Sequence, residues 1–231
     1  MEQRQEYLHE MGVQLWTRRE AGPAAAEEAI PGPTAGDTGA GIAGMDWQSL
    51  HACVATCQRC ELGTQRTRAV FGVGNQEADW LIIGEAPGAE EDRQGEPFVG
   101  RAGQLLNAML AAIGLGREQV YIANILKCRP PGNRDPRPAE VARCAPFLAR
   151  QVELLRPRII LALGRIAAQN LLQTETPIGK LRGRRYQYRD SGIPLVVTYH
   201  PAYLLRSPRE KRKAWADLQL AMACLREAGG A

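Results

Sequence analysis

Four short apolar runs are the clearest feature of the chain, and each has the length of a β-strand. Each run is rich in Ile, Leu and Val, as expected for a strand that is buried on both faces of a sheet. The runs are WLIIGEA from Trp80, VYIANILKC from Val120, RIILALG from Arg158 and PLVVTYHP from Pro194. They predict four strands in one buried sheet.

Helical patterns of apolar residues lie between and around these runs. They cover residues 102–113, 138–155, 165–172 and about 208–226, and a further helix is expected in MDWQSLHACVATC with Asp46 as its N-cap. Strands that alternate with helices indicate a parallel sheet with helices on both sides. The chain is therefore predicted to have an α/β fold.

The carboxyl ends of the predicted strands mark the expected ligand site, because ligands of such sheets bind outside these ends. The four ends are the GEAPG turn from Gly84, the segment 124–128, Gly164 and the segment 199–201. We expect the acidic turn, Asn124, His200 and a basic loop to meet at one mouth. A packed, structural role is the alternative for His200.

The first 44 residues differ in character from the rest. Apolar side chains near one face of a helix within residues 1–20 are Leu8, Met11, Leu15 and Trp16. Residues 21–44 are rich in Ala, Gly and Pro, which is typical of a flexible linker. The sequence predicts an amphipathic helix (1–20), a linker (21–44) and one folded domain (45–231). The helix is either a solvated leader or a binding segment for a protein partner.

The composition is that of an ordinary globular protein, with 45% apolar and 23% charged residues among 231. No apolar run reaches the roughly 18 residues of a membrane span, and the N-terminus is too polar for a secretory signal. We therefore expect a cytoplasmic protein without a membrane partner, and we expect it to be monomeric.

Four of the six cysteines follow the pattern C-x2-C-x67-C-x15-C: Cys57, Cys60, Cys128 and Cys144. Disulfides are disfavoured in the cytosol. Four thiolates suit either structural zinc or a 4Fe–4S cluster, and buried unliganded thiols and redox chemistry remain as alternatives. Cys53 and Cys224 are left over as ordinary thiols.

Positive charge is concentrated in residues 180–213, which carry ten Lys and Arg against Asp190 and Glu210, although the whole chain has a net charge of +4. Such a segment is either a contact surface for a phosphate backbone or a solvated face. The candidate phosphate contacts are Arg184, Arg185, Arg206 and, in the proline-rich loop after Cys128, Arg134.

Three segments carry a specific resemblance: GEAPGAEEDRQGEPFVGRAGQLL, NILKCRPPGNRDPRP and HPAYLLR. Together, in this order and with the cysteine spacing, they resemble the family 4 uracil-DNA glycosylases, the iron–sulfur branch of that superfamily. The resemblance covers about residues 53–225. It implies a three-layer α/β/α fold with a central, mostly parallel four-stranded sheet. It also implies excision of uracil from single- or double-stranded DNA, which initiates base excision repair at the nucleoid.

The resemblance also implies roles for individual residues. A mainly structural 4Fe–4S cluster is expected on Cys57, Cys60, Cys128 and Cys144. The uracil pocket is expected to comprise Glu85, Ala86, Phe98, Asn124 and His200. These residue types suit the chemistry, because a ring stacks on the base, an amide matches uracil O4 and N3–H, and an imidazole stabilises charge on O2.

Ala86 is a departure from the best-known branch of the superfamily, which has an aspartate there to position the attacking water. The water is therefore held by the backbone or by a nearby carboxylate, for which Glu85 and Glu91 are the candidates. Alternatively, Glu91 abuts uracil C5 and excludes the methyl group of thymine. Glu90 and Asp92 are expected at the surface or paired with Arg93 or Arg101.

Two rival functions fit the sequence less well. An iron–sulfur DNA-binding accessory protein without glycosylase activity would not need Phe98, Asn124 and His200 together. The related branch that crosslinks covalently to the abasic product carries an extra histidine after the second motif, and this chain has none between His51 and His200.

Overall fold

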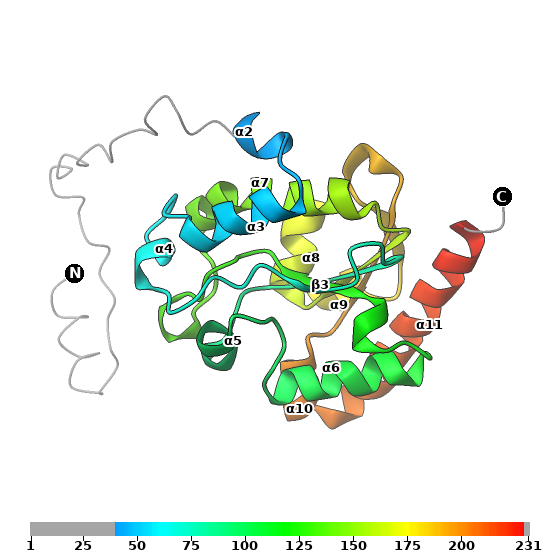
Figure 1. Ribbon diagram of the computed structural model, residues 1–231. Helices are drawn as coiled ribbons and strands as arrows, with labels where there is room; N and C mark the ends of the chain where they lie inside the picture. Colours follow the sequence, from blue (N-terminus) through cyan, green and yellow to red (C-terminus); the bar gives the residue numbers. More distant parts are fainter. Residues whose placement is uncertain (1–39, 229–231) are drawn as a thin grey trace, which may run out of the picture. The chain divides into compact units, whose positions relative to one another are not determined.

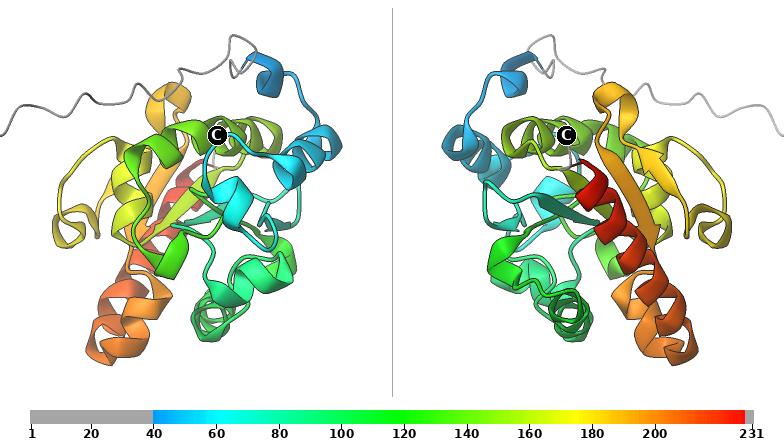
Figure 2. Two further views of the ribbon diagram at one scale, coloured as in Figure 1. Left: turned by 90° about the vertical axis from the view of Figure 1, so that its left-hand side faces the viewer. Right: turned by 90° about the vertical axis from the view of Figure 1, so that its right-hand side faces the viewer.

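The structure of the protein is a computed structural model that describes residues 40–228 (Figure 1). A six-stranded sheet is flanked by helices on both faces (Figures 1 and 2). The strands are β1 (Val73–Gly74), β2 (Trp80–Gly84), β3 (Tyr121–Asn124), β4 (Ile159–Leu163), β5 (Arg185–Gln187) and β6 (Pro194–Thr198). The predicted α/β class is confirmed.

The order of the strands is β1-β3-β2-β4-β6-β5. The four central strands are parallel and are the four that the apolar runs predicted, whereas β1 and β5 pair antiparallel at the edges. The prediction of a four-stranded sheet is therefore wrong by two strands. Neither edge strand has an apolar run, because β1 has two residues and β5 reads Arg-Tyr-Gln with both arginine and glutamine exposed.

Alternate residues of the central strands enter two separate cores. Leu81 and Ile83 face a cluster formed with α7 (Pro138–Leu155) and α8 (Arg165–Leu172). Ile82 faces a cluster formed with α6 (Arg101–Ala112), α10 (Pro201–Arg206) and α11 (Lys211–Ala228). Burial on both faces explains why these strands lack the alternation of polar and apolar residues that is typical of exposed sheets.

The helices largely follow the sequence pattern. α7 and α8 have the predicted bounds, α6 begins one residue earlier, and α11 is preceded by the 3-10 turn η4 (Pro208–Glu210). Asp46 caps α3 (Trp47–Thr56) as predicted, because its Oδ1 accepts a hydrogen bond from the backbone N–H of Ser49 at 2.8 Å. Four short elements had no periodic signal: α4 (Leu62–Gln65), α5 (Ala89–Gln94), α9 (Ile178–Leu181) and α10. The remaining 3-10 turns are η1 (Arg117–Gln119), η2 (Pro131–Asn133) and η3 (Arg189–Ser191).

The folded part begins before residue 45. The short helix α2 (Ala40–Ala43) lies within the segment that the sequence assigns to the linker, and its Ile42 is buried in a third apolar cluster with Leu50 and Phe147. The predicted helix over 1–20 and most of the predicted linker lie outside the described residues. Within residues 40–228, no helix is both long and apolar enough to cross a membrane.

Candidate active site and cysteine cavity

A cavity opens at the carboxyl ends of the parallel strands, where the sequence predicts the ligand site. Its wall includes every residue of the expected uracil pocket: Glu85, Ala86, Phe98, Asn124 and His200. Glu91, Arg134 and Arg206 also line it. The structure thus brings together side chains from three segments that are far apart in the sequence.

Asn124 ends β3 at the floor of the cavity. Its side chain is 2% exposed, and its Oδ1 has no hydrogen-bond partner among the described residues. Gly84, its partner in β2, makes room for it, since a Cβ there would lie 2.4 Å from this oxygen and 2.7 Å from the ring of Phe98. A buried amide oxygen without a partner is costly unless a ligand supplies a donor.

His200 is the N-cap of α10, and this contact fixes its tautomer. Its Nδ1 accepts a hydrogen bond from the backbone N–H of Ala202 at 3.1 Å, so the ring proton of the neutral form is on Nε2. Burial, with a smaller contribution from Arg206, lowers the pKa of His200 to about 4. The imidazole is therefore a neutral hydrogen-bond donor at pH 7.

Phe98 supplies the flat apolar wall. Its ring is stacked on that of His200, with centroids 5.5 Å apart and planes 29° apart, and the side chain is 7% exposed. Its backbone has φ of 55°, which is the left-handed region. A bulky residue in that region is held there by its surroundings.

The two acidic candidates differ in what their carboxylates contact. Glu91 accepts hydrogen bonds from three backbone N–H groups, those of Gly88 (3.1 Å), Val99 (3.1 Å) and Gly100 (3.3 Å). Its oxygens are therefore engaged in holding the loop around Phe98. Burial, and secondarily the nearby carboxylate of Asp135, raises the pKa of Glu85 to about 6.

Two other acidic residues of the turn, Glu90 and Asp92, differ in their surroundings. Glu90 pairs with Arg93 as expected. The surface expectation for Asp92 is wrong, because its side chain is buried and its Oδ1 accepts a hydrogen bond from the backbone N–H of Thr67 at 3.0 Å. A carboxylate can be buried here because a backbone donor that lies 25 residues away in the sequence compensates its burial.

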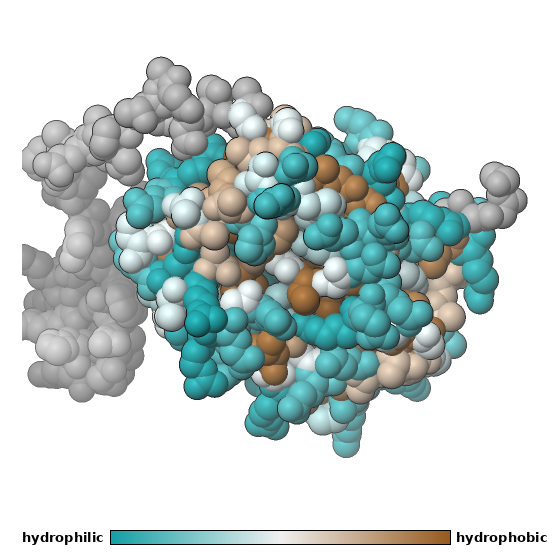
Figure 3. Space-filling model, in the orientation of Figure 1, coloured by the Kyte–Doolittle hydropathy of each residue, from teal (hydrophilic) through white to brown (hydrophobic). Residues whose placement is uncertain are grey.

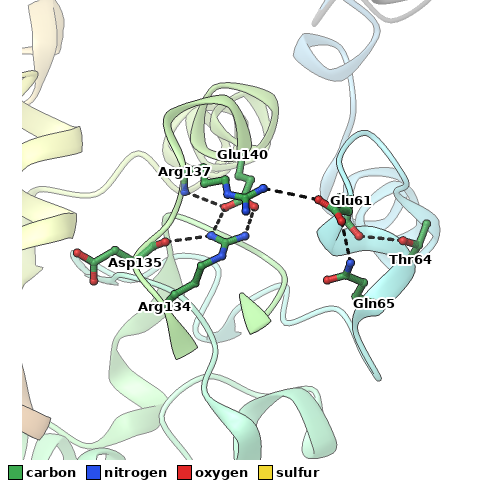
Figure 4. Close-up of polar contacts among 7 residues, drawn as sticks. All are labelled: Glu61, Thr64, Gln65, Arg134, Asp135, Arg137 and Glu140. Carbon is green, nitrogen blue, oxygen red and sulfur yellow. Dashed lines mark hydrogen bonds and ion pairs between the residues drawn. The ribbon is translucent and has the colours of Figure 1, made fainter. Parts of the chain in front are cut away.

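The predicted phosphate contacts fall into two groups. Arg206 and Arg134 line the cavity, and Arg134 is held by a bidentate ion pair to the buried carboxylate of Glu140 (Figure 4). Arg184 and Arg185 do not line it, and Arg185 is paired with Glu227 at 2.6 Å.

Asn133, Asp135 and Tyr203 also line the cavity although the sequence had not assigned them to the pocket. The only sequence signal that they belong to the pocket was their position, within the predicted basic loop or the HPAYLLR segment.

The four patterned cysteines line a second, smaller cavity. Two of the sulfurs accept hydrogen bonds: Cys128 Sγ from Arg66 Nη1 at 2.9 Å, and Cys144 Sγ from the backbone N–H of Lys127 at 3.3 Å. Neither Cys53 nor Cys224 is in its wall. In the described part of the chain, no three metal-binding side chains converge closely enough to hold a single ion.

Comparisons with known proteins identify the family of the chain. The family model of the uracil DNA glycosylase superfamily matches residues 71–219. The type-4 uracil-DNA glycosylase of Archaeoglobus fulgidus is 47% identical over 172 residues, which cover 72% of this chain and 86% of the relative. The chain belongs to the type-4 uracil-DNA glycosylases.

Two further type-4 relatives extend the match. The enzyme of Pyrobaculum aerophilum is 43% identical over 182 residues, covering 76% of this chain and 93% of the relative. The enzyme of Thermotoga maritima is 41% identical over 179 residues, covering 76% of this chain and 93% of the relative. The resemblance inferred from the three motifs is therefore confirmed. The type-4 glycosylase is a hydrolase of N-glycosyl bonds that acts in base excision repair, and type-4 enzymes are iron–sulfur proteins.

The face of this glycosylase seen in Figure 3 is mostly hydrophilic, with small apolar patches. Among the described residues, the exposed large apolar side chains are Tyr203 and Trp215. Tyr203 is at the rim of the active-site cavity and packs against Tyr199, with ring centroids 4.9 Å apart. The exposed ring of Tyr203 at the rim is suited to contact with nucleotides that flank the target.

Proposed function

We propose that the cavity at the strand ends binds a uracil flipped out of DNA, and that Phe98, Asn124 and His200 recognise it. The observation that carries this proposal is a buried cavity with an unpartnered amide oxygen, a donor Nε2 and an apolar ring face. These three groups match the N3–H, the O2 and the π-face of uracil.

Recognition depends on the amide of Asn124. Its oxygen accepts from uracil N3–H and its nitrogen donates to O4, whereas cytosine presents the opposite pattern and would leave both groups unpaired. A site built on such hydrogen bonds rejects the wrong base strongly, because the buried polar groups lose their partners.

Cleavage of the N-glycosidic bond leaves negative charge on uracil and positive charge on the sugar. His200 lowers the barrier by donating from Nε2 to O2 as this charge develops, in the manner of an oxyanion hole. The contact with Ala202 fixes the direction of the donor before the substrate binds. The protein thus needs no proton transfer from His200.

We propose Glu85 as the group that holds the attacking water. It lines the cavity, and its raised pKa of about 6 leaves it ionised at neutral pH but able to accept a proton. Glu91 is less suited to this role, since three backbone N–H groups already bind its carboxylate. The role of Glu91 is to shape the loop that carries Phe98.

Glu85→Gln gives a test in which activity and stability change in opposite directions. The folded protein raises the pKa of Glu85 from 4.5 to about 6, so its ionised form destabilises the fold as the pH rises through about 6. We expect the variant to be more stable than wild type by on the order of 1 kcal/mol at about pH 8, with little difference near the unfolded pKa. The rate of uracil release should rise through about pH 6 in wild type and lose this step in the variant. Unfolding curves and single-turnover rates across this range check both; an unchanged rate profile would remove Glu85 from the mechanism.

We further propose that Cys57, Cys60, Cys128 and Cys144 hold a 4Fe–4S cluster. Four thiols around a cavity, with an arginine and a backbone N–H donating to sulfur, suit a cluster in which each iron takes one thiolate. A single zinc ion would need all four sulfurs within roughly 2.3 Å of one point. When bound, the cluster supplies structural order. Cys128 and Cys144, as its ligands, would hold both ends of the loop that carries Asn133, Arg134 and Asp135 to the active site, and Cys57 and Cys60 would link this loop to the end of α3.

Arg206 and Arg134 are proposed to contact DNA phosphates at the mouth of the cavity. Among the described residues Arg206 has no ion-pair partner, so its charge is available. The pair with Glu140 orients Arg134 but also offsets its charge, so its contribution to affinity is expected to be the smaller one. The basic residues Arg184 and Arg185 remain proposed contacts for a more distant part of the strand.

The binding of free bases tests the proposed pocket. Uracil is expected to bind the wild-type protein, and cytosine is expected to bind far more weakly, as measured by calorimetry. Asn124→Ala should remove the preference for uracil and leave affinity for undamaged DNA unchanged. Equal binding of cytosine and uracil by the wild-type protein would contradict the assignment of Asn124.

Residues 1–39, which precede the described part of the chain, are proposed to be dispensable for catalysis. Deletion of residues 1–39 is expected to leave the rate of uracil release and the free energy of unfolding unchanged. Deletion of residues 1–44 also removes the buried Ile42 and should cost about 1–3 kcal/mol of stability. Urea unfolding of both variants measures the difference. A large loss of activity on deletion of 1–39 would show that the leader is part of the enzyme.

A further inference from the structure

Phe98 has a backbone conformation that its own side chain does not favour. Its φ of 55° is in the left-handed region, where phenylalanine is rare. Strained residues of this kind persist where surrounding contacts over-determine them, and they occur often at functional sites. The contacts that hold Phe98 therefore decide where its ring lies.

One side of the Phe98 loop is held through its N–H groups. The carboxylate of Glu91 accepts from the backbone N–H of Val99 and of Gly100, the two residues that follow Phe98. The carbonyl of Phe98 itself packs against Gly103 in α6, where a Cβ would lie 1.7 Å from the carbonyl oxygen. The backbone around Phe98 is thus confined by the carboxylate of Glu91 and by the close approach of Gly103.

The other side is held through its carbonyl groups by Arg117. Its Nη1 donates to the carbonyl oxygen of Phe98 at 3.3 Å, and its Nη2 donates to that of Pro97. Arg117 begins the 3-10 turn η1 and is also anchored to Asn107 Oδ1 of α6 at 3.3 Å. It is half-buried and is not in the wall of the active-site cavity, so it does not touch the base.

We propose that Arg117 is a positioning residue for base recognition: it binds the carbonyls of residues 97 and 98, and so holds the ring of Phe98 where it stacks on uracil. This inference rests on the proposed uracil pocket. The guanidinium fork presents one nitrogen to each carbonyl in a fixed plane, a geometry that the single nitrogen of a lysine ammonium reproduces only in part.

The test is the affinity for free uracil of Arg117→Met, measured by calorimetry, together with the single-turnover rate of uracil release. Since stacking of one base is worth roughly 1–3 kcal/mol, we expect a loss of about tenfold in both. Affinity for undamaged DNA should not change. Arg117→Lys should recover only part of the loss. Should Arg117→Met fail to fold, Arg117→Lys carries the same test with a smaller loss.

Two comparisons separate positioning from general destabilisation. Arg150→Met is the matched control, because Arg150 is also half-buried and donates to a backbone carbonyl, that of Met45 at 2.7 Å, away from the cavity. It should lower stability without changing uracil affinity. In a Phe98→Ala background, Arg117→Met should have no further effect on uracil affinity. Full additivity of the two substitutions, or wild-type uracil affinity in the folded Arg117 variants, would overturn the inference. Failure of the wild-type protein to bind uracil would instead overturn the proposed pocket.

Discussion

His200→Ala is expected to lower the single-turnover rate of uracil release by about 10²–10³-fold, as loss of one donor to a developing anion does in other enzymes. The reason is geometric. Nδ1 is occupied by the backbone N–H of Ala202, so Nε2 is the donor of a side chain that lines the active-site cavity. Alanine leaves the charge on uracil O2 without this donor, whereas binding of DNA, which depends on other residues, should be retained.

The pH dependence of the wild-type enzyme sharpens this prediction. Because burial lowers the pKa of His200 to about 4, the imidazole is neutral throughout the range in which Glu85 ionises. Protonation of His200 should therefore change the rate of uracil release only as the pH falls toward about 4, below the step assigned to Glu85. His51→Ala is the control, since His51 packs edge-on against Phe71 and lies outside the cavity. A His200→Ala enzyme with the wild-type rate would exclude His200 from leaving-group stabilisation.

Cys144→Ala is expected to abolish both the iron–sulfur cluster and the activity of the purified protein. Burial raises the pKa of the Cys144 thiol to about 12, so only a bound metal keeps this sulfur deprotonated at neutral pH. Loss of one ligand releases the loop between Cys128 and Cys144, and with it Asn133, Arg134 and Asp135 at the active site. Removal of a structural metal site costs a large share of the stability of a domain.

The measurements for this prediction are visible absorbance, iron and sulfide content, and thermal unfolding. Wild-type protein should be coloured and contain iron, and Cys144→Ala should be colourless, less stable and inactive. Cys53→Ala is the matched control, because Cys53 lies on α3, the helix that ends next to Cys57, but outside the cysteine cavity, and it should keep the colour and the activity. A colourless wild-type protein that contains zinc would contradict the cluster assignment.

Much of the fold could be predicted because the signals were local and redundant. The four central strands are buried on both faces, so each appears as an uninterrupted apolar run. α7 and α8 are long enough for helical periodicity to define their ends. The edge strands gave no such signal: β1 is too short, and β5 has the exposed polar side chains of Arg185 and Gln187. Its pairing depends on β6 rather than on its own composition.

The candidate site was predictable in its members but not in their contacts. The motifs named Asn124, Phe98 and His200, and the topology of a parallel sheet placed their segments at one edge. What the sequence could not show is that Glu91 binds backbone N–H groups, or that Arg117 reaches back to the carbonyl of Phe98. These are contacts between a side chain and the main chain, and main-chain groups have no signature in a sequence.

Release of uracil from DNA tests the central claim most directly. The purified protein, without added metal, should release the base from single-stranded and U·G-containing DNA and leave an abasic site, while matched DNA with thymine in place of uracil stays intact. Asn124→Ala, tested alongside, should bind the same DNA but release uracil orders of magnitude more slowly. Intact uracil-containing DNA after incubation with folded, iron-loaded protein, or equal release of thymine, would contradict the assignment of this cavity as a uracil-excising active site.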